Sequence, residues 1–157
     1  MKKGKILNKH LNNAIASMGH GDILIVADAG LPIPDEGKRI ELAIQKDKPD
    51  ILEILKLIVG DFIYERVIVA EEQKKYNPLL YENVVKCCSR CEVETIPHSE
   101  LIETMPMKAK FIVRTGAFEP WGNVILASGI DAPIWFQKKG TIIPGYYKKR
   151  VEYREKS

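Results

Sequence analysis

The sequence predicts an α/β protein: a three-layer α/β/α sandwich with a mostly parallel sheet, followed by a C-terminal extension. Short, continuous apolar runs alternate along the chain with amphipathic helical patterns, which is typical of βαβ units. Most of these runs lack the polar alternation of a strand that faces water on one side, so both faces of the sheet should be covered. At 157 residues, with 45% hydrophobic and 29% charged residues, the chain can form one core. We expect one domain over 1–130 and an extension over 131–157.

The first expected strand is the clearest. Residues 23–28 read ILIVAD, an apolar and β-branched run that suits a strand buried on both faces. Further strands are expected at 67–70, 111–113, 124–127 and, as a weaker alternating run, 93–96.

Helical patterns lie between these runs. Leu11, Ile15 and Met18 have helical spacing and stop at Gly19, a good residue to follow a helix. The apolar residues of 51–59 repeat this spacing, and Asn77-Pro78 is a credible N-cap and first residue of another helix.

Charge and composition exclude several function classes. The net charge of +3 divides into +4 on 131–157 and −1 on the rest, so the body lacks the basic excess of a nucleic-acid binder. No apolar run approaches the ~20 residues that span a bilayer, and the lysine-rich start lacks a signal-peptide core, so we expect a cytoplasmic protein without membrane association.

Neither a metal nor a cofactor is expected. Cys87, Cys88 and Cys91 form an odd cluster that suits a reducing compartment, and no second pair follows at zinc spacing. The segment 19–22 lacks the glycine pattern and the lysine of phosphate-binding loops.

Two candidate site residues follow expected strands. Ligands of open α/β sheets bind outside the carboxyl ends of the strands, and Asp28 ends the first strand. The alternative for Asp28 is a turn cap, which aspartate also favours. His98 follows the 93–96 strand and could equally start a helix.

His20 lies between Gly19 and Gly21, just before the first strand. A lone loop histidine is more often a solvated surface group. At ~3.3 Å per residue the strand places His20 and Asp28 at opposite ends of one protomer. If they cooperate, the chain must bend back or a neighbouring subunit must supply one of them.

Trp121, Gly122 and Asn123 precede the last strand. An aromatic ring beside an amide is a common sugar platform, because the ring packs on C–H groups while the amide bonds to hydroxyls. The alternative is a core tryptophan with a turn asparagine.

Taken together, the sequence resembles the D-ribose pyranase and L-fucose mutarotase family over most of 1–130. The resemblance is carried by segments in the same order and spacing: Met1-Lys2-Lys3-Gly4, Leu7-Asn8, Met18-Gly19-His20-Gly21-Asp22, Asp28-Ala29-Gly30-Leu31-Pro32-Ile33-Pro34, Ala70-Glu71-Glu72, Asn77-Pro78, His98 and Asn123-Val124-Ile125-Leu126. The segment from Asp28 to Pro34 resembles the ribose branch in particular.

The resemblance implies an enzyme that interconverts the pyranose and furanose forms of a monosaccharide, D-ribose, without a cofactor. It implies that His20 is catalytic, that Asp28 binds sugar and supports proton transfer, that His98 contacts substrate, and that Trp121, Gly122 and Asn123 occupy a sugar-binding element. It also implies a ring-shaped homo-oligomer, a decamer or octamer, with active sites between subunits.

Two departures bear on the sugar. Trp121 stands where the ribose branch usually has tyrosine, and the chain continues for 27 residues beyond Ile130. An L-fucose mutarotase, or a sugar-binding module without turnover, therefore remains an alternative. The aromatics and lysines of the extension also suit single-stranded RNA, although packing on a neighbouring subunit or closure over the cleft is the favoured interpretation.

Overall fold

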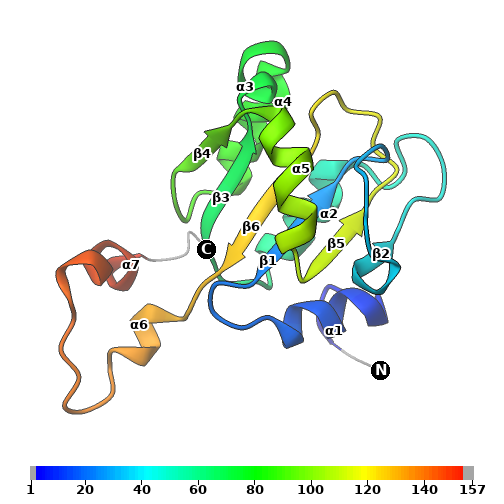
Figure 1. Cartoon of the computed structure of the whole chain (residues 1–157). Coiled ribbons are helices and arrows are strands. Elements are labelled where there is room, and N and C mark those ends of the chain that lie inside the picture. Colours follow the sequence, from blue (N-terminus) through cyan, green and yellow to red (C-terminus); the bar gives the residue numbers. More distant parts are fainter. Residues whose placement is uncertain (1–2, 154–157) are drawn as a thin grey trace.

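A six-stranded sheet with helices on both faces forms the body of the protein, which confirms the predicted sandwich (Figure 1). The computed structural model describes residues 3–153. The first two residues of the predicted domain and the last four of the predicted extension, Arg154 and Lys156 among them, therefore lie outside the described residues.

The sheet is mostly parallel. Its order is β2-β5-β1-β6-β3-β4, and β6 alone runs antiparallel to its neighbours β1 and β3, whereas β2/β5, β5/β1 and β3/β4 pair in parallel. The strands are β1 Ile23–Ala27, β2 Arg39–Glu41, β3 Tyr64–Ala70, β4 Val93–Ile96, β5 Phe111–Arg114 and β6 Val124–Ser128. The five expected strands are present, and the three-residue β2 was not predicted.

The helices include all three that were expected. They are α1 Lys9–Ser17, α2 Ile51–Val59, α3 Glu71–Tyr76, α4 Pro78–Cys87, α5 His98–Lys108, α6 Ala132–Trp135 and α7 Lys148–Glu152, with the 3-10 turns η1 Glu36–Lys38 and η2 Gly145–Tyr147.

Two helix termini differ from the predictions: the end of α1 and the start of α4. Helix α1 ends at Ser17, and Gly19 does not adopt the left-handed conformation, which falls instead on Gly21 with a φ of 85°. Asn77 is the N-cap residue of α4, but its side chain does not cap the helix. Its amide nitrogen donates to Glu119 Oε2 and to the Pro120 carbonyl, at 3.1 and 3.2 Å, so the side chain binds the 119–120 segment and its oxygen does not accept from the helix N–H groups.

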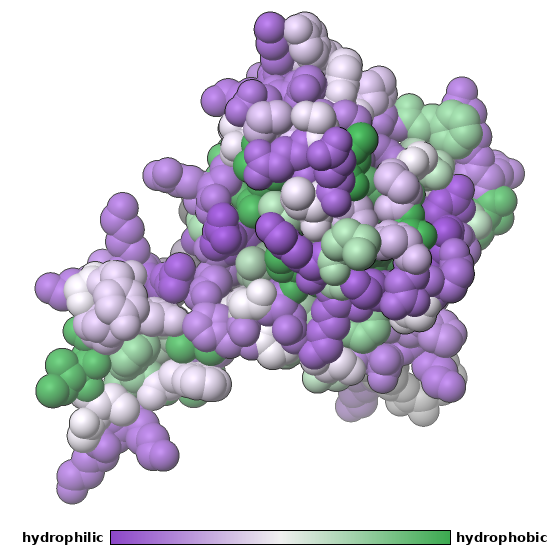
Figure 2. Space-filling view, viewed as in Figure 1, coloured by the Kyte–Doolittle hydropathy of each residue, from purple (hydrophilic) through white to green (hydrophobic). Residues whose placement is uncertain are grey.

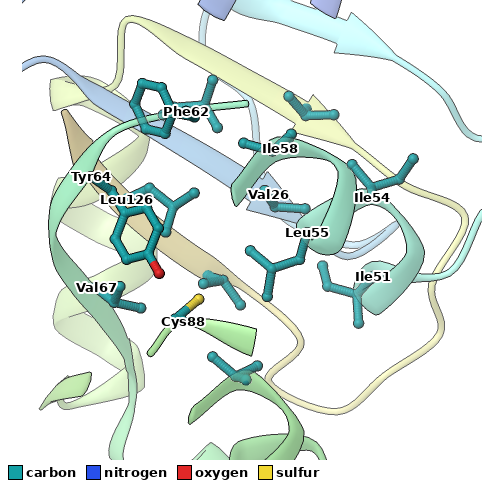
Figure 3. Close-up of a cluster of buried hydrophobic side chains, with 14 of the residues drawn as sticks. Val26, Ile51, Ile54, Leu55, Ile58, Phe62, Tyr64, Val67, Cys88 and Leu126 are labelled. Atoms are coloured by element: carbon teal, nitrogen blue, oxygen red, sulfur yellow. The ribbon is translucent and has the colours of Figure 1, made fainter. Parts of the chain in front are cut away.

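Two cores lie on opposite faces of the sheet. Helices α1, α2 and α4 cover one face, where Leu55 and Ile58 are fully buried against Val26 and Leu126 (Figure 3). Helix α5 covers the other face through Leu101. Burial of such side chains stabilises the fold by roughly 1.5–3 kcal/mol each, so the helices on both faces contribute to its stability.

The C-terminal extension leaves the sheet after β6. Helices α6 and α7 lie beside the body, and hydrophobic side chains reach the surface there, at the lower left of the view (Figure 2). Ile134, Trp135 and Tyr146 are exposed, although the Tyr147 ring packs on Phe136 with centroids 5.4 Å apart. Within 3–153, no helix has the length and apolar character to cross a bilayer.

Candidate active site

A cleft of about 620 Å³ opens at the carboxyl edge of the parallel strands. The strand topology explains its position, because β1, β3, β4 and β5 all end at this edge and the antiparallel β6 begins there. The volume is within the usual range for a small-molecule site. Its lining includes Asp28, Gly30, Leu31, His98, Ile102, Arg114, Phe118, Glu119, Trp121 and Asn123.

Asp28 is held in a fixed orientation by Asn123. The Asn123 Nδ2 donates to Asp28 Oδ2 at 2.9 Å, and the backbone N–H of Asp28 donates to Asn123 Oδ1 at 3.1 Å. The other carboxylate oxygen accepts from the N–H of Gly30 at 2.8 Å. Asp28 therefore caps a turn and also lines the cleft, and the buried Asn123 bonds to it directly.

Gly122 allows the two segments to approach. A Cβ at this position would lie 2.8 Å from Glu119 Cβ and 3.3 Å from Asp28 Cβ, closer than such atoms normally come. Gly122, which was expected among the sugar-binding residues, does not itself line the cleft, and its lack of a side chain permits close packing against Asp28.

Trp121 lines the cleft in a constrained backbone conformation. Its φ is 55°, which side chains rarely adopt, and its carbonyl accepts from the buried Gln73 Nε2 at 2.6 Å. The ring lies 5.5 Å from that of Tyr76 and is half-buried. Neither sequence interpretation is complete, because the tryptophan packs partly on the core and partly faces the cleft.

His98 is the first residue of α5 and also lines the cleft. Its backbone N–H donates to Glu72 Oε2 at 2.9 Å, which satisfies one of the free donors at the helix start. The helix-start interpretation is thus confirmed, and the position of His98 in the cleft is compatible with a site residue.

Arg114 is a cleft residue that the sequence analysis missed. Its Nε and Nη2 donate to the Ala29 carbonyl at 3.1 and 3.0 Å, and its Nη1 contacts Glu41 at 3.1 Å. Burial raises the pKa of Glu41, but the N–H of Ala43 and the Arg114 guanidinium outweigh this and hold it below its usual value. Arg114 ends β5 at the carboxyl edge, so the rule that selected Asp28 would have found it.

His20 lies at the opposite edge of the sheet, outside the cleft. Its Nε2 contacts Glu65 Oε1 at the start of β3, and the five residues of β1, about 17 Å of strand, separate it from Asp28. The chain does not bend back, so one protomer does not bring His20 and Asp28 together.

The loop that carries His20 is well anchored. Asp22 Oδ2 accepts from the N–H of Gly19 at 2.7 Å and from Lys110 Nζ at 2.6 Å, and Lys110 also donates to the Ser17 carbonyl at 2.6 Å. The hydrogen bond from Lys110 lowers the pKa of Asp22, with a further contribution from the Gly19 N–H. The imidazole, about half of whose side-chain surface is exposed, is thus presented on a fixed loop.

Residues 1–131 match the RbsD / FucU transport protein family. D-ribose pyranase 2 of Rubrobacter xylanophilus is 48% identical over 151 residues, which are 96% of this chain and 98% of that protein. D-ribose pyranase 1 of Streptomyces griseus is 42% identical, over 96% of this chain and 100% of that protein. Among solved structures, Bacillus subtilis RbsD complexed with D-ribose has a TM-score of 0.78 and 35% identity, covering 83% of this chain and 98% of that one.

These comparisons also divide the relatives by length. The alignment with the Rubrobacter and Streptomyces proteins spans nearly all of this chain, whereas the Bacillus protein is almost fully covered by a shorter part of it. The continuation beyond Ile130 is therefore a departure from the shorter relatives, as expected, but it is shared with the Rubrobacter and Streptomyces proteins.

Proposed function

Because the chain belongs to the RbsD / FucU transport protein family, we propose that it is an isomerase that interconverts the pyranose and furanose forms of D-ribose. The names of its relatives and the ribose complex of the Bacillus protein support this substrate. The observation that carries the proposal is the cleft, in which a carboxylate oriented by Asn123 lies beside the Trp121 ring. A carboxylate and an aromatic face are suited to sugar hydroxyls and C–H groups.

The complete site is formed by two protomers in this proposal. Asp28, His98, Trp121 and Asn123 of one protomer bind the sugar, and His20 of a neighbour supplies the acid. The separation of His20 and Asp28 by the length of β1 supports a shared site. The assembly is a ring-shaped homo-oligomer, a decamer or octamer, of 1–130 domains with 131–157 as an extension. The three free cysteines suit a cytoplasmic location.

The reaction opens and recloses a hemiacetal. His20 protonates the ring oxygen while the anomeric hydroxyl, hydrogen-bonded to Asp28, gives its proton to the Asp28 carboxylate, so that the bond from C1 to the ring oxygen breaks and the aldehyde forms. A different hydroxyl then attacks C1 and the protons return. Imidazole suits this role because it exchanges protons near neutral pH, and a positioned acid or base contributes about 10²- to 10⁴-fold in rate.

Saturation-transfer NMR of ribose tests the role of His20. We expect His20→Ala to abolish the catalysed exchange between the anomeric signals of the two ring forms while the oligomer persists. His10→Ala, an exposed histidine of α1, is the matched control and should exchange at the wild-type rate. Unchanged exchange in His20→Ala would refute the proposal.

Complementation tests the shared site. Co-expressed His20→Ala and Asp28→Ala chains should regain activity, because about one site in four would combine an intact His20 from one chain with an intact Asp28 from the other. Each variant alone should be inactive. No recovery in a mixed oligomer would place both groups in a single-protomer site and contradict the proposal.

A panel of monosaccharides distinguishes the alternatives. We expect faster exchange for D-ribose than for L-fucose; the reverse order would favour a fucose mutarotase. Binding of a pentose without accelerated exchange would identify a sugar-binding module instead.

A further inference from the structure

The loop that carries His20 faces a mostly buried carboxylate, that of Glu65, which the proposed reaction does not use. Glu65, the second residue of β3, keeps only 14% of its side-chain surface exposed, and its Oε1 contacts His20 Nε2. Gly129 packs directly against it, since a Cβ there would lie 3.1 Å from Glu65 Cβ and Cγ. A buried carboxylate is costly unless it is paired, so its partners are informative.

The second partner of Glu65 comes from the C-terminal extension. Arg150 Nη1 in α7 lies 2.9 Å from Glu65 Oε2 and forms an ion pair, although its N–H is not aligned well enough to count as a hydrogen bond to that buried oxygen. The Arg150 guanidinium also lies 5.0 Å from the centroid of the Tyr147 ring. Glu65 is thus held between an imidazole of the body and a cation of the extension.

We propose that Glu65 is a positioning residue for His20 and that Arg150 gives the C-terminal extension a part in the active site. The inference rests on the proposed function, in which His20 transfers the proton. A carboxylate that accepts from Nε2–H holds neutral imidazole in the tautomer whose free lone pair is on Nδ1. Nδ1 then faces the substrate, donating as imidazolium and accepting as imidazole.

Arg150 acts on His20 indirectly, through Glu65. It occupies Oε2, so that Oε1 remains directed at His20 and the Glu65 side chain does not rotate toward solvent. Chains of the family that end near residue 131 must orient their histidine without this arginine, so the extension adds a device that the shorter relatives lack.

The kinetics of three variants test the positioning roles of Glu65 and Arg150. We expect Glu65→Gln to lower kcat for ring exchange roughly ten- to hundredfold with little change in KM, because orientation and not sugar binding is lost. Arg150→Met should lower kcat less, and Arg150→Lys should restore most of the loss because the cation returns. The controls Glu82→Gln and Lys149→Met remove exposed charges of α4 and α7 and should behave as wild type.

Nitrogen-15 NMR of the imidazole rings gives a readout that a merely structural role would not move. The chain has only three histidines, so the His20 signals can be assigned by substitution. In neutral wild-type His20 we expect Nδ1 to be the unprotonated nitrogen, and in Glu65→Gln a mixture of tautomers. If His20→Ala is inactive but Glu65→Gln and Arg150→Met keep wild-type kcat and tautomer, this inference fails and the proposed function stands; if His20→Ala is active, the proposed function fails first.

Discussion

Replacing Asn123 with alanine should damage both the stability and the activity of the protein. The substitution removes the hydrogen bond to the Asp28 carboxylate, worth about 1.5–3 kcal/mol, and the bond from the Asp28 N–H, worth about 0.5–1.5 kcal/mol. Asp28 is only half-buried, so water replaces part of the first bond. We therefore expect a loss of roughly 2–3 kcal/mol in the free energy of unfolding.

Urea unfolding at a fixed protomer concentration measures this loss. With a slope of about 2 kcal/mol per molar urea, the midpoint should fall by roughly 1–1.5 M at unchanged slope. In ring-exchange NMR, kcat/KM for ribose should fall about ten- to hundredfold because the carboxylate is no longer fixed. Asn13→Ala, at an exposed position of α1, is the control. A midpoint and kcat/KM equal to wild type would refute the view that Asn123 orients Asp28.

Three further outcomes are expected. Gly122→Ala should cost about 1–3 kcal/mol of stability through the 2.8 Å contact it creates, whereas Gly145→Ala, with no atom within 4 Å of the new Cβ, should not. The midpoints of urea unfolding test this, and equal midpoints for the two variants would contradict it. Trp121→Ala should raise KM for ribose roughly three- to tenfold with a smaller effect on kcat, and an unchanged KM would exclude the ring as a sugar contact. Lys110→Met should destabilise the protein at pH 7, because Lys110 lowers the pKa of the Asp22 carboxyl, and such a carboxyl stabilises the fold at pH values above its unfolded pKa. The difference from wild type should shrink as the pH falls from about 3.8 through the lower pKa that Asp22 has in the fold, and a pH-independent difference would contradict the pairing.

The features that could be predicted from the sequence were those set by local pattern. The run 23–28 marks a strand buried on both faces, and its end places Asp28 at the carboxyl edge. The opposite positions of His20 and Asp28 also followed from the length of an extended strand.

The features that were missed depend on distant partners. Strand β2 has polar residues at both ends and exists because it pairs with β5, and Arg114 is oriented by Glu41 of that same strand. Of helix α5 only a start at His98 was considered, because Pro106 lies inside the helix and its apolar positions do not form a clear stripe. Glu65 is 45 residues from His20 in sequence, so nothing local indicates their contact.

The placement of His20 and Asp28 at opposite edges of the sheet makes activity depend on assembly. Each chain carries His20 at one edge of the sheet and Asp28 at the opposite edge. Under the proposed function every site joins the His20 edge of one chain to the Asp28 edge of another. The number of sites therefore equals the number of chains in a closed ring or a two-fold dimer. An isolated protomer would keep its two cores, which lie within one chain, yet have no complete site. Activity should therefore fall on dilution below the association threshold while the circular dichroism of the fold persists, and activity that is proportional to concentration through dissociation would show that one chain suffices.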